Sequence, residues 1–377
     1  MFIKGVGMTR FGIQNDATSH MVHEAAIEAL DDAEMSMEEV DIIVMSNMDI
    51  LSNGERQRHS ASMASSLFKK QMPIITVPAG CAGGGTALWT AMQFYRTTNY
   101  KNILVIGFEK IVSNSSKRVT DEILMGGERI YEQTEGLNFP AQNALVAQMY
   151  MDKYGATLDD FAKVAYKNHQ NAKLNPKARF YKKEVTLDDI KNSPVVASPL
   201  RMHDCSISCN GAAAVVLSRE QTDIEIAGSG EFTDFLAPFE REDMCTWEAT
   251  INSAKQAYAQ AGINNEKLDI AEVHDAFTSV ELISYEDLGF CKKGEGKDLI
   301  RKEVTFMNGK LPVNTSGGLK AKGHPISATG VSQIYELVKQ MRKQASGRQI
   351  DNVKYGLAQN IGGAGSTVTV HILKNAG

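Results

Sequence analysis

The chain has 377 residues, of which 43% are hydrophobic and 23% are charged, a balance that is typical of a globular protein built around a core. Its formal net charge of -5 at pH 7 argues against a nucleic-acid-binding protein, because such proteins normally show a basic face. At about 150 residues per domain, the length predicts two to three structural units.

Targeting and metal signals are weak in this sequence. No stretch approaches the roughly 18 consecutive apolar residues of a membrane-spanning helix, the start MFIKGVGMTRFG has no apolar signal core, and the end KNAG carries no address motif. We therefore expect a cytoplasmic protein without a membrane partner or a nucleic-acid partner. The five cysteines are irregularly spaced, and Cys205 with Cys209 lacks the second pair of a closed zinc site, so we expect reduced thiols and no metal.

The first part of the chain predicts alternating strands and helices. Short apolar runs alternate with segments whose apolar residues recur at helical spacing. In chain order, strands are predicted at 2–7, 42–45, 74–77 and 103–106, and helices at 19–33 and 86–95. This alternation is typical of an α/β sheet covered by helices.

The segment at about 113–200 is more polar and predicts helices at 140–154 and 158–171 but no strong strand. We interpret it as a loop domain inserted into the first half. A second α/β run follows, with strands predicted at 212–217, 224–227, 270–273, 355–358 and 367–373 and helices at 247–261 and 331–343. We therefore divide the chain into two loosely similar halves, 1–222 and 223–377.

Cys81 is the first candidate for a catalytic residue. It lies in ITVPAGCAGGGTALWT, where a predicted strand ends and a predicted helix begins. The free N–H groups and the positive dipole end of a helix start favour an anion, so we expect its thiolate to form more easily than that of a free cysteine. Cysteine is also often only a small buried residue, so a catalytic role depends on the neighbours of Cys81.

Two histidines and a glycine-containing loop are candidate neighbours. His324 lies in GHPISATG, a turn before a helix that mirrors the Cys81 turn, where a histidine suits proton transfer near neutral pH. His274 ends a predicted strand, which points it to the pocket edge of an α/β sheet, unless the segment HDAF only caps a helix. The loop at 359–363 is expected to offer backbone N–H groups to a developing oxyanion. His203, in a similar segment, is interpreted as structural.

At these residues the chain resembles the thiolase superfamily, most closely its sterol-carrier-protein-type and archaeal members. The resemblance covers nearly the whole length, in the motifs GVGMTRFG, AGCAGGG, GLNFPAQNALVAQMYMDKYG, VAYKNHQNAKLNP, DCSISCNGAAAVVL, HDAF and GGLKAKGHPISATG. It implies a five-layered αβαβα fold of two similar halves with an inserted loop domain. It also implies a homodimer that packs through the first half.

The resemblance implies a role for each candidate. Cys81 matches the nucleophile that carries an acyl group as a thioester, and His324 matches the histidine that activates it and stabilises an enolate oxygen. His274 matches a position that helps to hold an oxyanion-site water, and the N–H groups of Cys81 and Gly362 match a second oxyanion hole. The implied activity is that of an acetyl-CoA acyltransferase, which cleaves or forms acetoacetyl-CoA or a related branched or aryl 3-oxoacyl-CoA. Coenzyme A and acyl-CoA are then substrates, and no bound cofactor is expected.

One part of the family pattern is missing. Many thiolases carry a second cysteine, an acid or base, where this chain has Asn360, and sterol-carrier-type members carry it where this chain has Ala276. Claisen condensation removes an α-proton and thiolysis deprotonates the CoA thiol, so another group must act. A cysteine from elsewhere, Cys205 or Cys291, is one alternative. The two others are a histidine that performs both transfers and a substrate that supplies its own acidic or basic group.

Two rival functions stay open at the level of sequence. The first is a decarboxylative condensing enzyme similar to ketoacyl synthases, whose reaction needs no α-proton abstraction. The second is a subunit that becomes active only with a small zinc-ribbon/OB-fold partner protein, as part of a larger complex.

Overall fold

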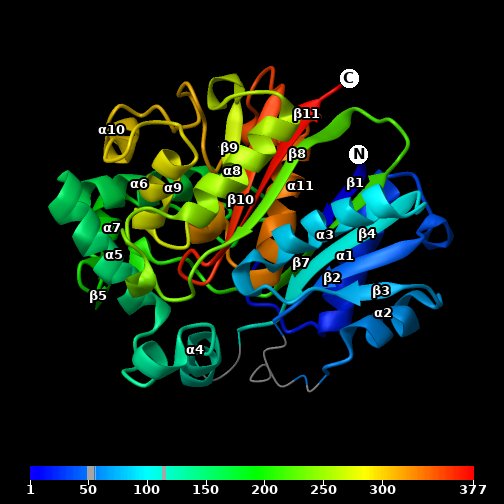
Figure 1. Ribbon diagram of the computed structural model, residues 1–377, viewed down its shortest axis with the longest axis horizontal. Coiled ribbons are helices and arrows are strands. Elements are labelled where there is room, and N and C mark those ends of the chain that lie inside the picture. Colours follow the sequence, from blue (N-terminus) through cyan, green and yellow to red (C-terminus); the bar gives the residue numbers. More distant parts are fainter. Residues whose placement is uncertain (49–54, 56, 113–115) are drawn as a thin grey trace.

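The computed structural model describes residues 1–48, 55, 57–112 and 116–377 (Figure 1). The first three residues of the predicted insertion, 113–115, lie outside the described residues. Within the described part, no helix is both long enough and apolar enough to cross a membrane.

One mixed sheet of nine strands runs through the molecule in the order β3-β2-β4-β7-β1-β8-β11-β10-β9. Its two halves meet where β1 pairs with β8, through Phe2 opposite Glu225 and Ile3 opposite Ile224. In each half the strands nearest the outer edge are parallel, β3 with β2 and β9 with β10. The strands are β1 Phe2–Met8, β2 Ile42–Ser46, β3 Ile74–Thr76, β4 Asn102–Glu109, β7 Gly211–Ser218, β8 Ile224–Thr233, β9 Ile270–Glu272, β10 Tyr355–Gly362 and β11 Thr367–Asn375.

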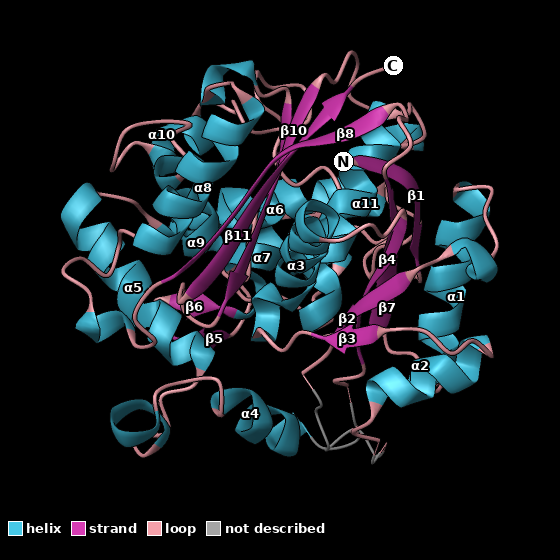
Figure 2. Ribbon diagram, turned by 45° about the vertical axis from the view of Figure 1, so that its right-hand side comes forward, coloured by secondary structure: helices cyan, strands magenta, loops and turns pink. Residues whose placement is uncertain are grey.

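Helices fill three layers around the two halves of the sheet, as Figure 2 shows. Helices α3 and α11 lie between the halves, α1 and α2 cover the outer face of the first half, and α8 and α9 cover that of the second. This arrangement confirms the predicted five-layered αβαβα fold. The helices are α1 Thr18–Asp32, α2 Ser60–Phe68, α3 Gly83–Thr97, α8 Glu248–Ala261, α9 Thr278–Asp287 and α11 Thr329–Met341.

The sequence of each helix matches its layer. In α1, buried residues such as Val22, Ala26 and Ala29 recur at a spacing of three or four, which places them on one face toward the sheet. Almost every residue of α11 is buried, and this is expected of a helix that has sheet on both sides. The buried apolar residues accordingly form one cluster between the halves and one on each outer face of the sheet.

The inserted segment contains helices and a small hairpin. It comprises α4 Ser116–Leu124, α5 Phe139–Tyr154, α6 Leu158–Lys173, α7 Leu187–Lys191, and the pair β5 Val195–Ala197 with β6 Leu200–Arg201. The helices predicted at 140–154 and 158–171 correspond to α5 and α6, whereas α4, α7 and the hairpin were not predicted. Asn138 caps α5 by accepting the Ala141 N–H at 3.1 Å, and Gly155 ends the helix in the left-handed region, at φ 69°. The domain boundaries proposed from the sequence stay a prediction.

Two elements differ from the sequence prediction in a way that matters for the site. Residues 359–362, predicted as a loop, are the last part of β10, because the ladder to β11 continues through Asn360 opposite Thr369 and Gly362 opposite Thr367. Helix α3 begins at Gly83, three residues earlier than predicted, directly after a 3₁₀ turn at Gly80–Ala82. Asn360 is therefore held rigidly in a strand, and Cys81 lies in a turn of its own.

Candidate active site

Cys81 lies in the 3₁₀ turn between β3 and α3. The turn begins at Gly80, whose φ of +53° lies in the left-handed region that favours glycine. The pKa of the Cys81 thiol is raised to about 12, first by burial and second by the charge of Glu109, against the opposing effect of the N–H groups of Gly363 and of Cys81 itself. The structure thus differs from the sequence expectation, because burial outweighs the helix start. In the free protein Cys81 is a thiol that needs a base.

Two glycines allow α3 and α11 to touch at their first turns. A Cβ atom at Gly84 would lie 2.6 Å from the carbonyl oxygen of Ser327, and one at Gly330 would lie 2.3 Å from the backbone nitrogen of Gly85. Both distances are shorter than any ordinary contact, so only glycine permits this approach. The contact brings the Cys81 turn, which precedes α3, close to the His324 turn, which precedes α11.

His324 is held in one orientation at the start of α11. Its backbone N–H donates to the Ile207 carbonyl at 2.9 Å, and its Nδ1 lies 2.7 Å from the Thr329 hydroxyl oxygen. Burial, together with the charge of Lys322, lowers the pKa of His324 to about 3, so the ring is neutral at physiological pH. Because Thr329 occupies Nδ1, the second ring nitrogen, Nε2, is the one left for chemistry.

His274 follows β9, and its ring lies 5.4 Å from that of His324, centroid to centroid, at an interplanar angle of 89°. Its Nδ1 accepts the Ile361 N–H at 3.3 Å, so in the neutral ring the proton is on Nε2. Burial, and to a smaller extent the neighbouring His324, lowers the pKa of His274 well below its usual value. His274 is therefore a neutral hydrogen-bond donor at Nε2 and is unsuited to act as a base.

Asn360 joins the Cys81 turn, helix α3 and His274. Its side-chain oxygen accepts the Gly85 N–H at 3.1 Å, and its amide nitrogen donates to the Cys81 carbonyl at 2.8 Å. The same nitrogen lies 3.2 Å from Nδ1 of His274. An amide does not titrate near neutral pH, and this one is fully engaged. Asn360 therefore positions the site and does not replace an acid or base.

Buried charged groups connect the two histidine segments. The Asp275 carboxylate accepts the N–H groups of Leu319 at 2.6 Å and Lys320 at 3.2 Å, and the Asn168 amide at 2.7 Å. Burial, and secondly the nearby Glu281, raises the pKa of Asp275 to about 7. Because Asp275 adjoins His274, and the Leu319–Lys320 backbone leads to His324, these bonds fix the separation of the two rings.

A cavity of about 330 Å³ contains the candidate residues. Cys81, His274 and His324 all line it, so the structure brings three of the predicted site residues together. The predicted Gly362 is not among the lining residues, whereas the next residue, Gly363, is, and its N–H acts on the Cys81 thiol. Much of the remaining wall is apolar and comes largely from α4, α5, β5 and the segment after β4, with Ile111, Ile123, Leu124, Phe139, Pro140 and Val196.

Further residues of the site escape prediction from the sequence. Thr329 orients His324, and Ser206 and Ser208 line the cavity together with Cys205, which the sequence had offered only as one alternative for the missing thiol. This segment is bridged to Phe277 and to His324 through backbone pairs across the chain, which no local pattern signals. The doubled glycine at 362–363 was a usable signal, although the sequence did not tell which of the two faces the thiol.

The other residues considered from the sequence lie elsewhere. Cys291 packs against the apolar core around α5, α8 and α9 and is not among the lining residues. His203 lies with Nδ1 3.3 Å from Nε2 of His169, which agrees with its interpretation as structural. All five cysteines are free.

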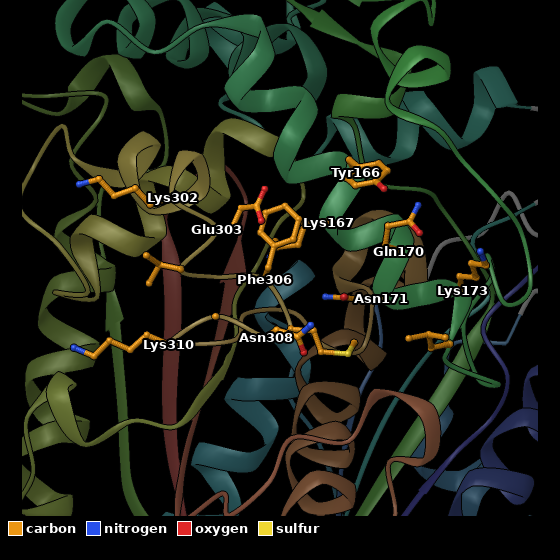
Figure 3. A pocket seen from close by; sticks show the side chains of 14 residues that line it. Tyr166, Lys167, Gln170, Asn171, Lys173, Lys302, Glu303, Phe306, Asn308 and Lys310 are labelled. Carbon is orange, nitrogen blue, oxygen red and sulfur yellow. The ribbon is translucent and has the colours of Figure 1, made fainter.

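A larger hollow of about 720 Å³ lies between α6 and the segment at 302–310. Figure 3 shows Lys302 and Lys310 extending to one side and Lys173 lying on the other, so these cations do not converge on one ligand. None of Cys81, His274 and His324 is among its lining residues. Size alone therefore does not identify the site, and the smaller cavity around Cys81 is the candidate.

Comparisons with known proteins agree with this geometry. Residues 1–221 match the model of the thiolase N-terminal domain, and residues 230–375 match that of the thiolase C-terminal domain-like family. An acetyl-CoA acetyltransferase of Methanothermobacter thermautotrophicus is 36% identical over 98% of this chain and 97% of its own. Sterol carrier protein 2 of Bos taurus is 31% identical over 98% of this chain and 71% of its own.

The fold has close counterparts among solved structures. One that is described as "Ltp2-ChsH2(DUF35) aldolase" matches with a TM-score of 0.83 and 26% identity, covering 99% of this chain and 97% of that one. Together the two family models span nearly the whole chain, in the order expected from the sequence motifs, and each of the two relatives spans 98% of it. The protein therefore belongs to the thiolase family and is an acyltransferase.

Proposed function

We propose that this protein cleaves or forms a 3-oxoacyl-CoA through an acyl-enzyme on Cys81, by ping-pong chemistry. One observation carries the proposal: the partly buried Cys81 thiol shares a cavity of about 330 Å³ with two neutral histidines. One of these, His274, is a fixed hydrogen-bond donor, and the other, His324, has a ring nitrogen free to take a proton. A nucleophile, a base and an oxyanion donor are the groups that acyl transfer requires.

In the cleavage direction, Nε2 of His324 takes the Cys81 proton while the sulfur attacks the 3-oxo carbon. The C2–C3 bond then breaks, the acyl group stays on sulfur as a thioester, and the electron pair forms the enolate of acetyl-CoA. The Nε2–H groups of His274 and of the newly protonated His324 stabilise the enolate oxygen, because both rings border one cavity. The N–H groups of Cys81 and Gly363 are suited to hold the thioester oxygen when CoA attacks.

The composition of the cavity wall influences which acyl group is bound. The apolar side chains of Ile111, Ile123, Leu124, Phe139 and Val196 favour an acyl chain with more carbon atoms than acetate, because each buried methylene contributes about 0.8 kcal/mol. The four-carbon acetoacetyl group of acetoacetyl-CoA is also small enough for a cavity of about 330 Å³, and the relative of 36% identity is named an acetyl-CoA acetyltransferase. We therefore propose coenzyme A and acyl-CoA esters as substrates, with no bound cofactor.

The proposed assembly is a homodimer packed through the first half. Strand β3 forms one edge of the sheet, and Ile75 on it is 40% exposed, which suits an edge that pairs with a second copy. A small additional partner is a second proposal, since the structure of 26% identity is described with two protein names, Ltp2 and ChsH2. We also propose a cytoplasmic location for the protein.

Mass spectrometry after incubation with a panel of acyl-CoA and 3-oxoacyl-CoA esters tests the function. We expect an acyl adduct on Cys81 in the wild type, and neither adduct nor thiolysis in Cys81→Ser. Retained thiolysis in Cys81→Ser refutes the proposal. Comparing malonyl-CoA with acetyl-CoA as extender separates it from decarboxylative condensation, and adding a co-purifying small protein separates it from a subunit that is inactive alone.

A further inference from the structure

A second thiol borders the cavity of Cys81. Cys205 is one of its lining residues, and its backbone is bridged to Phe277 in the segment that begins at His274. The next residue, Ser206, donates its N–H to the Ala276 carbonyl at 2.7 Å. Ala276, where the resemblance implies a cysteine in sterol-carrier-type members, therefore lies beside Cys205 in space, although the two are far apart in the sequence.

We propose that Cys205 is the acid and base of this active site, the group that exchanges a proton with the α-carbon of acetyl-CoA and with the thiol of coenzyme A. The inference rests on the proposed function. It places the acid and base in a segment other than those of Ala276 and Asn360.

The other groups of the site are already engaged. Nδ1 of His274 accepts the Ile361 N–H, which leaves only a donor at Nε2. His324 exchanges the proton of Cys81, and the Asn360 amide is bonded to Cys81 and Gly85. Among the described residues that line the cavity, the side chains that titrate as acids or bases in water are Cys81, Cys205, His274 and His324. Of these four side chains, only Cys205 has no other role in the proposed reaction.

The surroundings of Cys205 suit both protonation states. Its Sγ lies 3.5 Å from the Arg201 carbonyl oxygen, which accepts the thiol hydrogen. Its pKa is raised to about 11, chiefly by burial, with the charge of Lys320 opposing this shift and that of Asp204 adding to it. The buried Lys320 side chain donates to the backbone carbonyl of Cys205 at 2.6 Å, and its charge favours the Cys205 thiolate, although burial lowers the pKa of Lys320 itself. Cys205 is therefore protonated before the reaction and can act as an acid. The charge of Lys320 favours the thiolate that remains.

With Cys205 as acid and base, every proton of the cleavage reaction is accounted for. When the C2–C3 bond breaks, the enolate carbon takes the proton of the Cys205 thiol, which yields acetyl-CoA and a Cys205 thiolate. That thiolate takes the proton of the incoming CoA thiol, and the CoA sulfur attacks the thioester on Cys81. The Cys81 thiolate leaves and recovers its own proton from His324. Condensation is the same sequence in reverse, with Cys205 as the base that removes the α-proton.

The variant Cys205→Ala tests the proposal through two reactions that differ in their need for a proton. The first is thiolysis of the accepted 3-oxoacyl-CoA, with deuterium exchange into the methyl group of acetyl-CoA in D₂O as a second readout. We expect both to fall at least about 100-fold, as in the loss of a general acid or base. The second is acetylation of Cys81 by S-acetyl thionitrobenzoate, whose thiolate leaves without a proton. We expect this rate to stay within about threefold of wild type.

Matched variants complete the experiment. Cys205→Ser keeps the size of the side chain without an ionisable thiol and should behave as Cys205→Ala, whereas Cys291→Ala should match the wild type. Exchange in Cys205→Ala within about threefold of wild type overturns the inference, and so does loss of Cys81 acetylation, which indicates a structural role. If the wild type forms no acyl adduct on Cys81, the proposed function fails and the inference fails with it. If it does and Cys205→Ala exchanges normally, only the inference fails.

Discussion

Replacing Asn360 by alanine is a direct test of how the nucleophile turn is held. The substitution removes the acceptor of the Gly85 N–H and the donor to the Cys81 carbonyl, at 3.1 and 2.8 Å. Asn360 is only 1% exposed, so water does not replace these bonds. Each buried backbone group left without a partner costs about 1–3 kcal/mol, so the free energy of unfolding should fall by about 2–6 kcal/mol.

Urea unfolding followed by circular dichroism measures this difference. The matched control is Asn252→Ala, which removes an exposed amide that donates to the Glu248 carbonyl at 2.9 Å and should change the free energy of unfolding by less than about 0.5 kcal/mol. His274 keeps its bond to the Ile361 N–H in Asn360→Ala, so the loss should concern the Cys81 turn and not the histidine. An unfolding free energy within about 0.5 kcal/mol of wild type refutes the positioning role of Asn360.

Two further predictions concern charge in the interior. Because the pKa of Cys81 is about 12 and that of His324 about 3, alkylation of Cys81 by iodoacetamide should rise roughly tenfold per pH unit from about pH 7 to 10, without a step near pH 6.5. Peptide mass spectrometry reads the rate, and a plateau below about pH 9 contradicts the assignment. Lys167→Met should lower the free energy of unfolding by about 3–5 kcal/mol, because it leaves Glu281, 2.6 Å from Nζ, buried without its cation. Lys163→Met, which removes an exposed pair on the same helix, should cost less than about 1 kcal/mol, and equal losses refute the argument.

Much of the layered fold could be predicted because its strands and helices have clear local periodicity. The same holds for Cys81, His274 and His324, which follow or precede regular elements at turns rich in small residues. The position of Asn360 could not be predicted locally, because its strand continues only through pairing with β11. The low thiolate content of Cys81 also escaped prediction, since burial depends on what the rest of the chain places over the turn.

The role of Cys205 shows the same limit more sharply. The residues around Cys205 have the polar composition of a loop, and nothing near it in the sequence indicates a pocket. Its place in the cavity depends on backbone pairs to Phe277 and, through Ser208, to His324. The sequence could indicate that a thiol was missing and that Cys205 and Cys291 were available. Only tertiary pairing distinguishes the two.

The bond from Asn360 to the Cys81 carbonyl joins residues that are 279 positions apart. During synthesis the nucleophile therefore leaves the ribosome long before the residues that orient it. A nascent chain that has completed α3 carries the thiol but lacks both histidines and the strand that braces the turn. The cavity that Cys81 shares with His274 and His324 is therefore complete only after β10 has been made and has docked, so assembly of the site is a late event that requires both halves to have folded together.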